Sequence, residues 1–447
     1  MRDAKFQISV AGCAHDCWRD LMNGVNFRFD EDCISQVWCG YLPPLLRDLA
    51  RVGAAVYVAD RLTLRPQRSH GTGRQIALRV DVTSPEFWSS HLDLLVRILG
   101  VVSNDVWDLQ FRTGTTEPAQ AGLFAAESPA PLVCLYSGGL DSAAGLLNRL
   151  RDGVRSAVTV TVCHQPDQRR RVLRQLESFR RRYNARIIPI FVRTTLRHAP
   201  ALKHQELSQR CRSFLFLAIG GAVAATIGAG EVEIYESGVG VLNLPSMTGM
   251  LVGARATRSC HPELVRLMTE IVSAASGRPI AFLLPFVQQT KSEVVRAFVE
   301  ERLQAVVPLT TSCVHYPVRI GGNAKQCGLC FACIGRRQAL FAADADDPVS
   351  QYRHDICNKN CDATPMDFES LRAHLFQVAR LAEFSSQELP VWFSRHLYGS
   401  HVVQAGDPAE AWRDLMLRYR AEWLRWIERG RERHLKWAEL VNAPKAA

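Results

Sequence analysis

Short apolar segments alternate with longer amphipathic ones through the middle of the chain, from residue 128 to about 345. "LVCLY", "SAVTVTVCH", "ARIIPIFV", "EVEIYES" and "PIAFLLPF" have the length and the β-branched content of buried strands. Segments with helical periodicity, such as "DSAAGLLNRL" and "QRRRVLRQLESFRRRY", separate them. This alternation predicts an α/β domain built on a parallel, doubly wound sheet.

Two regions of different pattern flank the predicted α/β domain. In residues 1–127, "YLPPLLRDLARVGAAVYVADRLT" predicts a helix followed by an apolar strand at 54–59, and "RQIALRVDVT" predicts an alternating strand. We therefore expect an N-terminal α+β accessory domain, joined to the next domain by the turn-rich stretch 112–131. Residues 346–447 place Trp and Leu at helical spacing among many charges, which predicts a helical C-terminal region.

Composition narrows the class of protein. The net charge of +10 suits anionic ligands such as nucleotides, and 47% hydrophobic residues are ordinary for a globular chain. The beginning of the chain lacks the apolar run of a secretory signal, and the most apolar stretch, 214–230, is expected as a helix buried against a sheet. Without an export signal, clustered cysteines are better interpreted as metal ligands than as disulfides, so we expect a cytoplasmic protein without membrane contact.

A glycine-rich turn lies where the first strand of the α/β domain meets its first helix. It comprises Ser137, Gly138, Gly139, Leu140, Asp141 and Ser142. Glycines allow backbone N–H groups to converge on an anion, and the following helix adds its positive N-terminal end. Asp141 would repel phosphates unless a cation such as Mg²⁺ lies between them. Helix capping by Asp141 and Ser142 is the alternative, although it does not require this sequence after a buried strand.

Four cysteines near residue 320 have the spacing of a metal site. Cys313, Cys327, Cys330 and Cys333 give C-x13-C-x2-C-x2-C. Four thiolates in tight turns form a closed tetrahedral site for Zn²⁺, with an iron–sulfur cluster as the main competitor. Because all four positions are filled by protein ligands, this metal should stabilise the fold and take no part in the chemistry.

The glycine-rich turn resembles the PP-loop signature SGGxDS of N-type ATP pyrophosphatases, which split ATP between the α- and β-phosphates. With the cysteine cluster, the resemblance narrows to the QueC family of 7-cyano-7-deazaguanine synthases, which carry C-G-x-C-x-x-C-x-x-R at this place. Here the motif runs from Cys327 to Arg336. "QTKSEVVR" (289–296), "RSFLFLA" (212–218) and "CHPELVRLM", which begins at Cys260, are similar to further segments of that family.

The resemblance implies a function and a set of roles. That family adenylates the carboxylate of 7-carboxy-7-deazaguanine with ATP, and ammonia then displaces AMP. Residues 137–142 would hold ATP and Mg²⁺, with Asp141 and Ser142 also catalytic, and Cys163 and His164 would line the nucleotide site. Arg212 and Lys291 would face phosphates or the substrate carboxylate. The structural alternatives are a core-edge pair for Cys163 and His164, an interfacial cation for Arg212, and an ordinary first-turn residue for Lys291.

The chain departs from the typical synthase in one segment and in its length. Where that family has Asp-Tyr-Ser-Gly-Tyr-Pro-Asp-Cys, this sequence has the longer "YESGVGVLNLPSMTGMLVGARATRSCHPE". Glu236, Ser237 and Asn243 take the corresponding strand end and are expected to bind the guanine-like edge of the substrate. The alternative for Ser237 and Asn243 is a helix-capping or turn role. Together with the flanking regions, this segment resembles the larger QueC-like proteins of anti-phage operons, including the Qat system. A protein or nucleic-acid amine encoded nearby would then be an alternative acceptor to ammonia.

Other patterns leave alternatives open. The basic helix at 168–183 could contact nucleic acid or simply be solvated, and Cys357 and Cys361 with His354 and Asp355 could form a second metal site or be incidental thiols. Two rival functions also remain: a tRNA-modifying PP-loop enzyme of the thiolation or lysidine type, and a non-catalytic zinc protein that senses a nucleotide.

Overall fold

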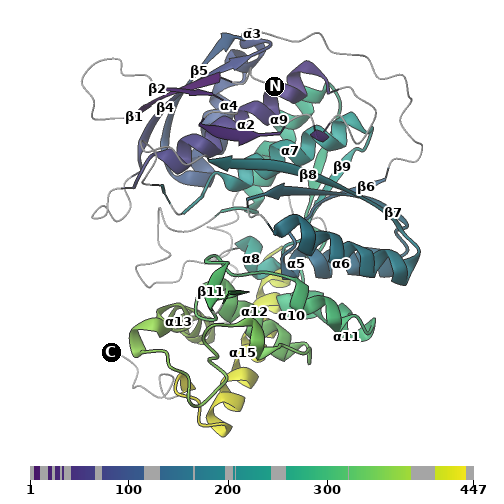
Figure 1. The fold of residues 1–447 in the computed structure, drawn as a ribbon, viewed down its shortest axis with the longest axis vertical. Helices are drawn as coiled ribbons and strands as arrows, with labels where there is room; N and C mark the ends of the chain where they lie inside the picture. Colours follow the sequence, from purple (N-terminus) through teal and green to yellow (C-terminus); the bar gives the residue numbers. More distant parts are fainter. Residues whose placement is uncertain are drawn as a thin grey trace.

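A computed structural model describes most of the chain (Figure 1). The described residues are 5–10, 19–22, 26–30, 33–34, 42–65, 73–114, 131–164, 167–196, 205–206, 208–242, 258–320, 322–383 and 408–438.

A six-stranded sheet forms the centre of the fold, with the strand order β10-β9-β6-β7-β8-β3. Its parallel strands are β6 (Leu132–Leu135), β7 (Ser156–Cys163), β8 (Arg186–Leu196), β9 (Glu231–Ile234) and β10 (Ala281–Leu283). Each one corresponds to a strand that the hydrophobic pattern predicts. The short strand β3 (Phe27–Phe29) completes the sheet antiparallel to β8. The parallel α/β architecture is therefore confirmed.

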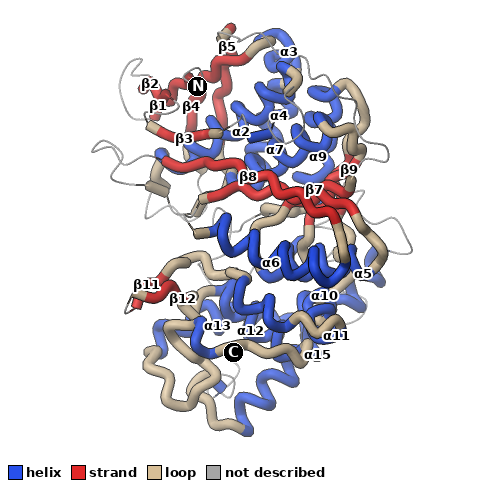
Figure 2. The backbone as a smooth tube through the Cα atoms, turned by 45° about the vertical axis from the view of Figure 1, so that its right-hand side comes forward, coloured by secondary structure: helices blue, strands red, loops and turns tan. Residues whose placement is uncertain are grey.

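Helices cover both faces of this sheet (Figure 2). One layer holds α5 (Leu140–Arg151), α6 (Gln168–Tyr183), α10 (Lys291–Val295), α11 (Ala297–Glu300) and the 3-10 helix η3 (Gln304–Leu309). The opposite layer holds α7 (Arg212–Thr226) and α9 (Pro262–Ser276). The apolar stretch 214–230 thus lies mostly in α7, which packs against β6 and β7 as expected. No helix in the described part of the chain combines the length and the apolar character needed to cross a bilayer.

The first region forms a second, four-stranded sheet, β2-β1-β4-β5. Its strands are β1 (Lys5–Val10), β2 (Arg19–Met22), β4 (Gln75–Val82) and β5 (Val106–Thr113), and its helices are α2 (Pro44–Leu62), α3 (Pro85–Ser90) and α4 (Leu92–Ser103). The alternating strand expected from "RQIALRVDVT" is β4. Most of the linker expected at 112–131 lies outside the described residues.

The prediction of a strand at 54–59 is wrong, because these residues continue helix α2. All six are buried, since α2 packs between α7 and the four-stranded sheet. A helix that is buried on several sides shows a continuous apolar run, and in sequence such a run resembles a buried strand. Through α2 and β3, the first region is packed directly onto the central sheet and its helices.

A buried ion cluster joins α2 to the four-stranded sheet. The Arg74 guanidinium lies 2.5 Å from Asp60 on α2 and 2.6 Å from Asp105, which precedes β5. Asp60 also accepts the backbone N–H of Cys211 at 3.1 Å, directly before α7. Burial opposes the charge of Arg74, but hydrogen bonds and attraction from the two carboxylates outweigh it and raise the pKa of Arg74. The cluster therefore fixes the first region to the helix that begins at Arg212.

We expect Arg74→Met to lower the free energy of unfolding by about 3–5 kcal/mol, because it removes the cation paired with buried Asp60 and one of the two cations, Arg65 being the other, paired with buried Asp105. Arg112→Met is the control, since the Arg112–Asp81 pair is exposed and should be worth less than about 1 kcal/mol. Urea unfolding of both variants measures the difference. Equal losses would contradict a structural role for the cluster.

The C-terminal region is helical, as expected. Its longer helices are α13 (Glu369–Glu383) and α15 (Pro408–Glu432), preceded by the 3-10 turns η4 (Val349–Gln351) and η5 (Pro365–Phe368). Both pack on α12 (Phe331–Ala342), which follows the two-stranded ribbon of β11 (Val318–Ile320) and β12 (Asn323–Lys325). In Figure 1 they lie at the end of the molecule opposite the four-stranded sheet.

Candidate active site and metal centre

The glycine-rich loop lies at the carboxyl end of β6 and runs into α5, as the sequence predicts. Gly138 has a φ of +77°, a conformation that L side chains rarely adopt, and a Cβ there would lie 2.7 Å from Val172. The Ser137 hydroxyl accepts the N–H of Gly139 at 3.2 Å and lies 3.3 Å from the Ser142 hydroxyl. Leu140 is fully buried in the core, so only its backbone is available to a ligand. The loop has the form of an anion cradle at a helix N-terminus.

Three groups that the sequence did not indicate support this loop: the side chains of Gln175 and Tyr136 and the backbone N–H of Thr311. The Gln175 amide of α6 donates to the carbonyls of Gly138 (3.2 Å) and Leu309 (2.7 Å). Its own oxygen accepts from the Tyr136 hydroxyl at 2.7 Å. The N–H of Thr311 also donates to the Gly138 carbonyl, at 3.2 Å. Gln175 is completely buried and lies on the apolar face of α6 with Val172, Leu176 and Phe179. A polar residue on that face of the helix was the signal in the sequence that could have indicated its role.

Asp141, Lys291 and Glu236 form a charged cluster beside the loop. The Lys291 ammonium at the start of α10 lies 2.8 Å from Oδ2 of Asp141, while Oδ1 of Asp141 is buried without a hydrogen-bond partner in the described part of the chain. Burial opposes the charge of Lys291, but the two carboxylates outweigh it and raise the pKa of Lys291. Burial, followed by repulsion from Asp141, raises the pKa of Glu236 to about 7, although Lys291 acts in the opposite sense.

The end of β9 supplies Glu236 because the following turn leaves room for it. A Cβ at position 240 would lie 2.1 Å from Oε1 of Glu236, so a larger residue there would displace this carboxylate. Ser237 is buried, and its N–H donates to the same oxygen at 3.2 Å. The short helix α8 (Gly238–Leu242) follows, and Asn243, the third expected substrate contact, lies outside the described residues.

The helix that presents Lys291 is held by the C-terminal region. Thr290 and Glu293 form a capping box at the start of α10. The buried carboxylate of Glu422 on α15 accepts from the hydroxyls of Thr290 (2.6 Å) and Ser292 (2.5 Å). Arg418, one turn earlier on α15, pairs with Glu293 at 2.8 Å. The last long helix of the chain therefore positions the two residues that flank Lys291.

Cys163, His164 and Arg212 lie at the next strand end and not in the charged cluster. Burial raises the pKa of Cys163 to about 11, which keeps this thiol neutral. His164 packs between the rings of Tyr57 and Phe216, and its Nδ1 donates to the Thr194 carbonyl at 3.1 Å. Arg212 is exposed, with its guanidinium 5.7 Å from the centre of the Phe216 ring. Among the described residues, Arg212 forms no hydrogen bond or ion pair with the loop.

We expect the stability of the protein to depend on His164 at mildly acidic pH. Burial, with repulsion from Arg212, lowers the pKa of His164 to about 3. The pKa of His164 in the folded protein lies below its ordinary value of about 6.5, so the unfolded chain binds a proton more readily than the folded one. The free energy of unfolding is therefore unaffected by His164 above pH 6.5 and decreases as the pH falls from 6.5 towards 3. At pH 5 the loss in the free energy of unfolding is about 1–2 kcal/mol. His164→Gln should lose less stability than the wild type between pH 7 and pH 5 in urea unfolding, and parallel profiles would contradict this.

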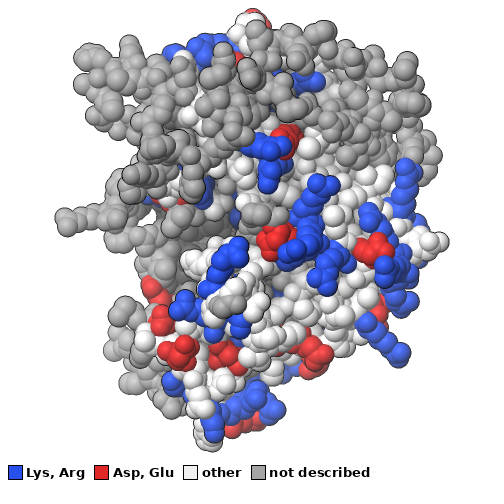
Figure 3. Space-filling view, in the orientation of Figure 1, with Lys and Arg blue, Asp and Glu red and all other residues white. Residues whose placement is uncertain are grey.

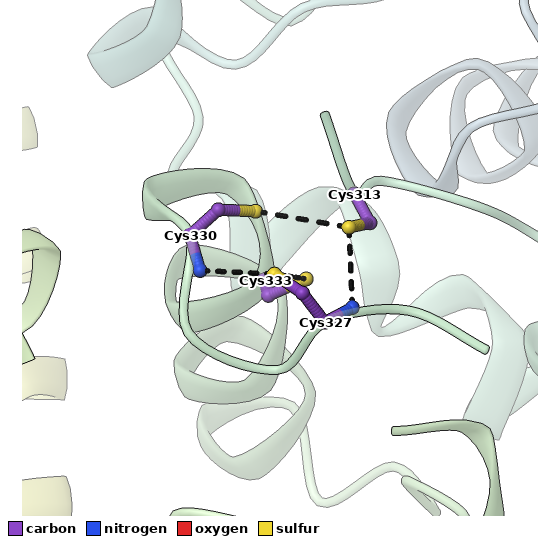
Figure 4. A group of neighbouring side chains, drawn as sticks. All are labelled: Cys313, Cys327, Cys330 and Cys333. Carbon is purple, nitrogen blue, oxygen red and sulfur yellow. Dashed lines mark hydrogen bonds between the residues drawn. The ribbon is translucent and has the colours of Figure 1, made fainter. Parts of the chain in front are cut away.

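The four predicted metal ligands come together in one group (Figure 4). The sulfur atoms of Cys313, Cys327, Cys330 and Cys333 all lie within 4.8 Å of one another. Two of the separations are 3.9 and 4.0 Å, close to the ~3.8 Å edge of a tetrahedron with Zn–S bonds of ~2.3 Å. Backbone N–H groups of Leu329 and Cys330 point at the sulfur of Cys327, and those of His315 and Cys327 at Cys313. The group fits a zinc ion with four thiolate ligands.

Cys357 and Cys361 do not belong to any such group. Among the described residues, the four cysteines above are the single cluster of His, Cys, Asp or Glu that could hold a metal ion. His354 instead pairs with Asp362, and Asp355 with Arg337. The second metal site considered from the sequence is therefore not formed within the described part of the chain.

The cysteine group is connected to the glycine-rich loop. Gln326, next to Cys327, accepts the N–H groups of Ser312 (3.0 Å) and Cys313 (3.2 Å). Arg336 of α12 is completely buried and donates to the Thr310 hydroxyl at 2.6 Å. These contacts fix the segment 310–313, and Thr311 within it bonds Gly138. A metal bound by the cysteines would thus stabilise one wall of the loop.

Comparison with known proteins relates part of the chain to one family. Residues 252–344 match the family model described as "Queuosine biosynthesis protein QueC". The matched range contains Lys291 and all four cysteines. These findings support a QueC-like PP-loop family.

The individual relatives are 7-cyano-7-deazaguanine synthases. The chain is 26% identical over 240 residues to the 7-cyano-7-deazaguanine synthase of Picrophilus torridus. This alignment covers 48% of the chain and 89% of that protein. The synthase of Anaeromyxobacter sp. is 27% identical over 143 residues, 31% of the chain and 53% of that protein. That of Hahella chejuensis is 30% identical over 91 residues, 20% of the chain and 36% of that protein. The chain thus spans about half of the second relative and about a third of the third.

Proposed function

We propose that the chain is an ATP-dependent ligase that adenylates the carboxylate of a 7-deazaguanine acid such as 7-carboxy-7-deazaguanine. The acid oxygen attacks the α-phosphorus of ATP, and the bond to the β-phosphate breaks to release pyrophosphate. An amine then displaces AMP and forms a C–N bond. The observation that carries the proposal is the Asp141–Lys291 pair at the mouth of the glycine-rich loop, 2.8 Å apart, in a chain similar to 7-cyano-7-deazaguanine synthases.

In this reaction the loop at 137–142 would hold the phosphates of ATP, with Ser137 and Ser142 as hydroxyl donors. Asp141 would bind Mg²⁺, which supplies positive charge between the carboxylate and the phosphates. Its buried Oδ1, which has no partner among the described residues, fits this role. Lys291 would stabilise the charge that develops on the phosphates. Glu236 and Ser237, at the adjacent strand end, would bind the purine-like edge of the substrate, together with Asn243.

Further roles extend to the neighbouring strand and to the metal. Cys163, His164 and Arg212 would line the nucleotide side of the site, as their position at the ends of β7 and α7 suggests. Cys313, Cys327, Cys330 and Cys333 would hold a structural Zn²⁺, which the four converging sulfur atoms fit.

The acceptor and the biological setting belong to the same proposal. The flanking regions that distinguish the chain from typical synthases contact the site: Glu422 of α15 bonds Thr290 at the start of α10, and the ring of Tyr57 on α2 packs on His164. Such additions suit an acceptor larger than ammonia, a protein or nucleic-acid amine, and a role in anti-phage defence like that of the Qat-type proteins that the sequence resembles. Neighbouring genes for a nuclease and an ATPase would support defence, and deazaguanine-pathway genes would favour biosynthesis.

Pyrophosphate release tests the substrate. With ATP, Mg²⁺ and 7-carboxy-7-deazaguanine, we expect pyrophosphate and AMP in equal amounts, and an amide or a nitrile by mass spectrometry when ammonium is present. The control is 7-deazaguanine, which lacks the carboxyl group and should give background release. Equal release with and without the carboxyl group would contradict the proposed substrate.

A further inference from the structure

Helix α6 forms one wall of an arginine-lined groove that the proposed reaction does not use. The groove has a volume of about 860 Å³ and lies between α6 and η3. Its α6 wall carries five arginines, which are Arg169, Arg170, Arg174, Arg180 and Arg181, and its η3 wall carries Ala305 and Leu309. Lys and Arg side chains gather over this part of the surface (Figure 3).

The positive charge of the groove is only partly neutralised. Glu177 is the single acidic residue among those that line it, and this carboxylate lies 2.7 Å from Arg181 and 3.9 Å from Arg180. Arg170 and Arg174 are exposed, and their guanidinium groups make no ion pair or hydrogen bond within the described part of the chain. Two adjacent cations without protein partners, one helical turn apart, therefore face the solvent in a concave surface.

We propose that this groove binds the phosphate backbone of a nucleic acid. Residues 170 to 181 extend about 16 Å along the helix, and a duplex strand presents a phosphate every ~3.4 Å of its axis, so the row can meet several phosphates. Guanidinium groups bind phosphate oxygens through two parallel hydrogen bonds. The net charge of +10 adds long-range attraction for such a partner.

The lining favours a nucleic acid over an acidic protein. Apart from the charged residues, the groove offers only Leu173, Ser178, Ala305 and Leu309. Stable protein interfaces need a core of aromatic or large apolar side chains, which this surface lacks. Backbone phosphates need none, so we expect binding that depends little on sequence and strongly on salt.

The groove is adjacent to the glycine-rich loop. Gln168, beside Arg169, donates to the Ser137 carbonyl at 3.0 Å, and Gln175 bonds both Gly138 and Leu309. The same helix therefore positions the loop with its inner face and lines the groove with its outer face. A strand bound in the groove would lie beside the proposed active site.

Binding without ATP tests the proposal independently of the reaction. The probes are a labelled 20-nucleotide RNA, the DNA of the same sequence and their duplexes, titrated by fluorescence anisotropy between 50 and 200 mM salt. We expect Arg170→Gln with Arg174→Gln to weaken binding about tenfold at 100 mM salt. The plot of the logarithm of the binding constant against the logarithm of the salt concentration should also become less steep, by about 1.5, because two phosphate contacts are lost.

The matched control is Arg425→Gln with Arg429→Gln, which removes the same charge from exposed positions on α15. This control should leave the affinity unchanged. Equal affinities of the wild type and the groove variant for all nucleic-acid probes would overturn the proposal. Tighter binding of polyglutamate than of nucleic acid at the same salt would also overturn it, in favour of an acidic protein partner.

Discussion

Asp141→Asn is expected to lower the rate of pyrophosphate release at least ~100-fold, because the Mg²⁺ that Asp141 would hold supplies charge that stabilises the transition state, and losing one such stabilising group typically costs roughly 100-fold or more. The amide keeps the size of the side chain but cannot bind Mg²⁺ as a carboxylate does, and it weakens the 2.8 Å contact with Lys291. Steady-state pyrophosphate assays with ATP and 7-carboxy-7-deazaguanine measure the effect.

Asp152→Asn is the matched control, because Asp152 follows the C-terminal end of the same helix and is half exposed. It should retain the full rate. An Asp141→Asn variant that is folded, binds ATP and releases pyrophosphate within threefold of the wild-type rate would contradict the role assigned to Asp141.

Removal of the metal is expected to have the largest effect on stability. We expect one zinc per chain, and Cys330→Ser should abolish it and lower the melting temperature by about 10 °C or more, since a structural zinc contributes directly to folding. Pyrophosphate release should fall as well, because Gln326 would no longer fix the segment 310–313, whose Thr311 bonds Gly138. Elemental analysis and thermal unfolding of the purified protein test both parts.

Cys357→Ser is the control for zinc loss, since Cys357 lies outside the four-sulfur group. It should keep the zinc and the melting temperature of the wild type. Stoichiometric iron with visible absorption would instead indicate an iron–sulfur cluster in the same ligands. A Cys330→Ser variant with unchanged metal content would contradict the assignment of the ligands.

Local patterns in the sequence predicted the central sheet and the grouping of the four cysteines, because both depend largely on residues close together in the chain. The strands of the sheet are short apolar runs between turns, and three of the four cysteines lie within seven residues. Helix α2 was the failure. Its run at 54–59 is apolar on all sides since α7 and a sheet enclose it, and this enclosure is a tertiary property that local periodicity does not reveal.

Contacts that support the site were harder to predict, because they join residues far apart in the sequence. Glu422 bonds Thr290 across 132 positions, and Gln175 bonds Leu309 across 134. Neither residue lies in a recognisable motif. The resemblance to the QueC family indicated Lys291, but it gave no indication that a helix from the end of the chain would hold the turn on which Lys291 lies.

This attachment links the order of the C-terminal helices to the state of the candidate active site. Whenever α15 detaches, Thr290 and Ser292 lose the carboxylate of Glu422, and the first turn of α10 loses its outer support. A change in the packing of α15 would therefore alter the placement of the Lys291 ammonium without any contact between α15 and the substrate.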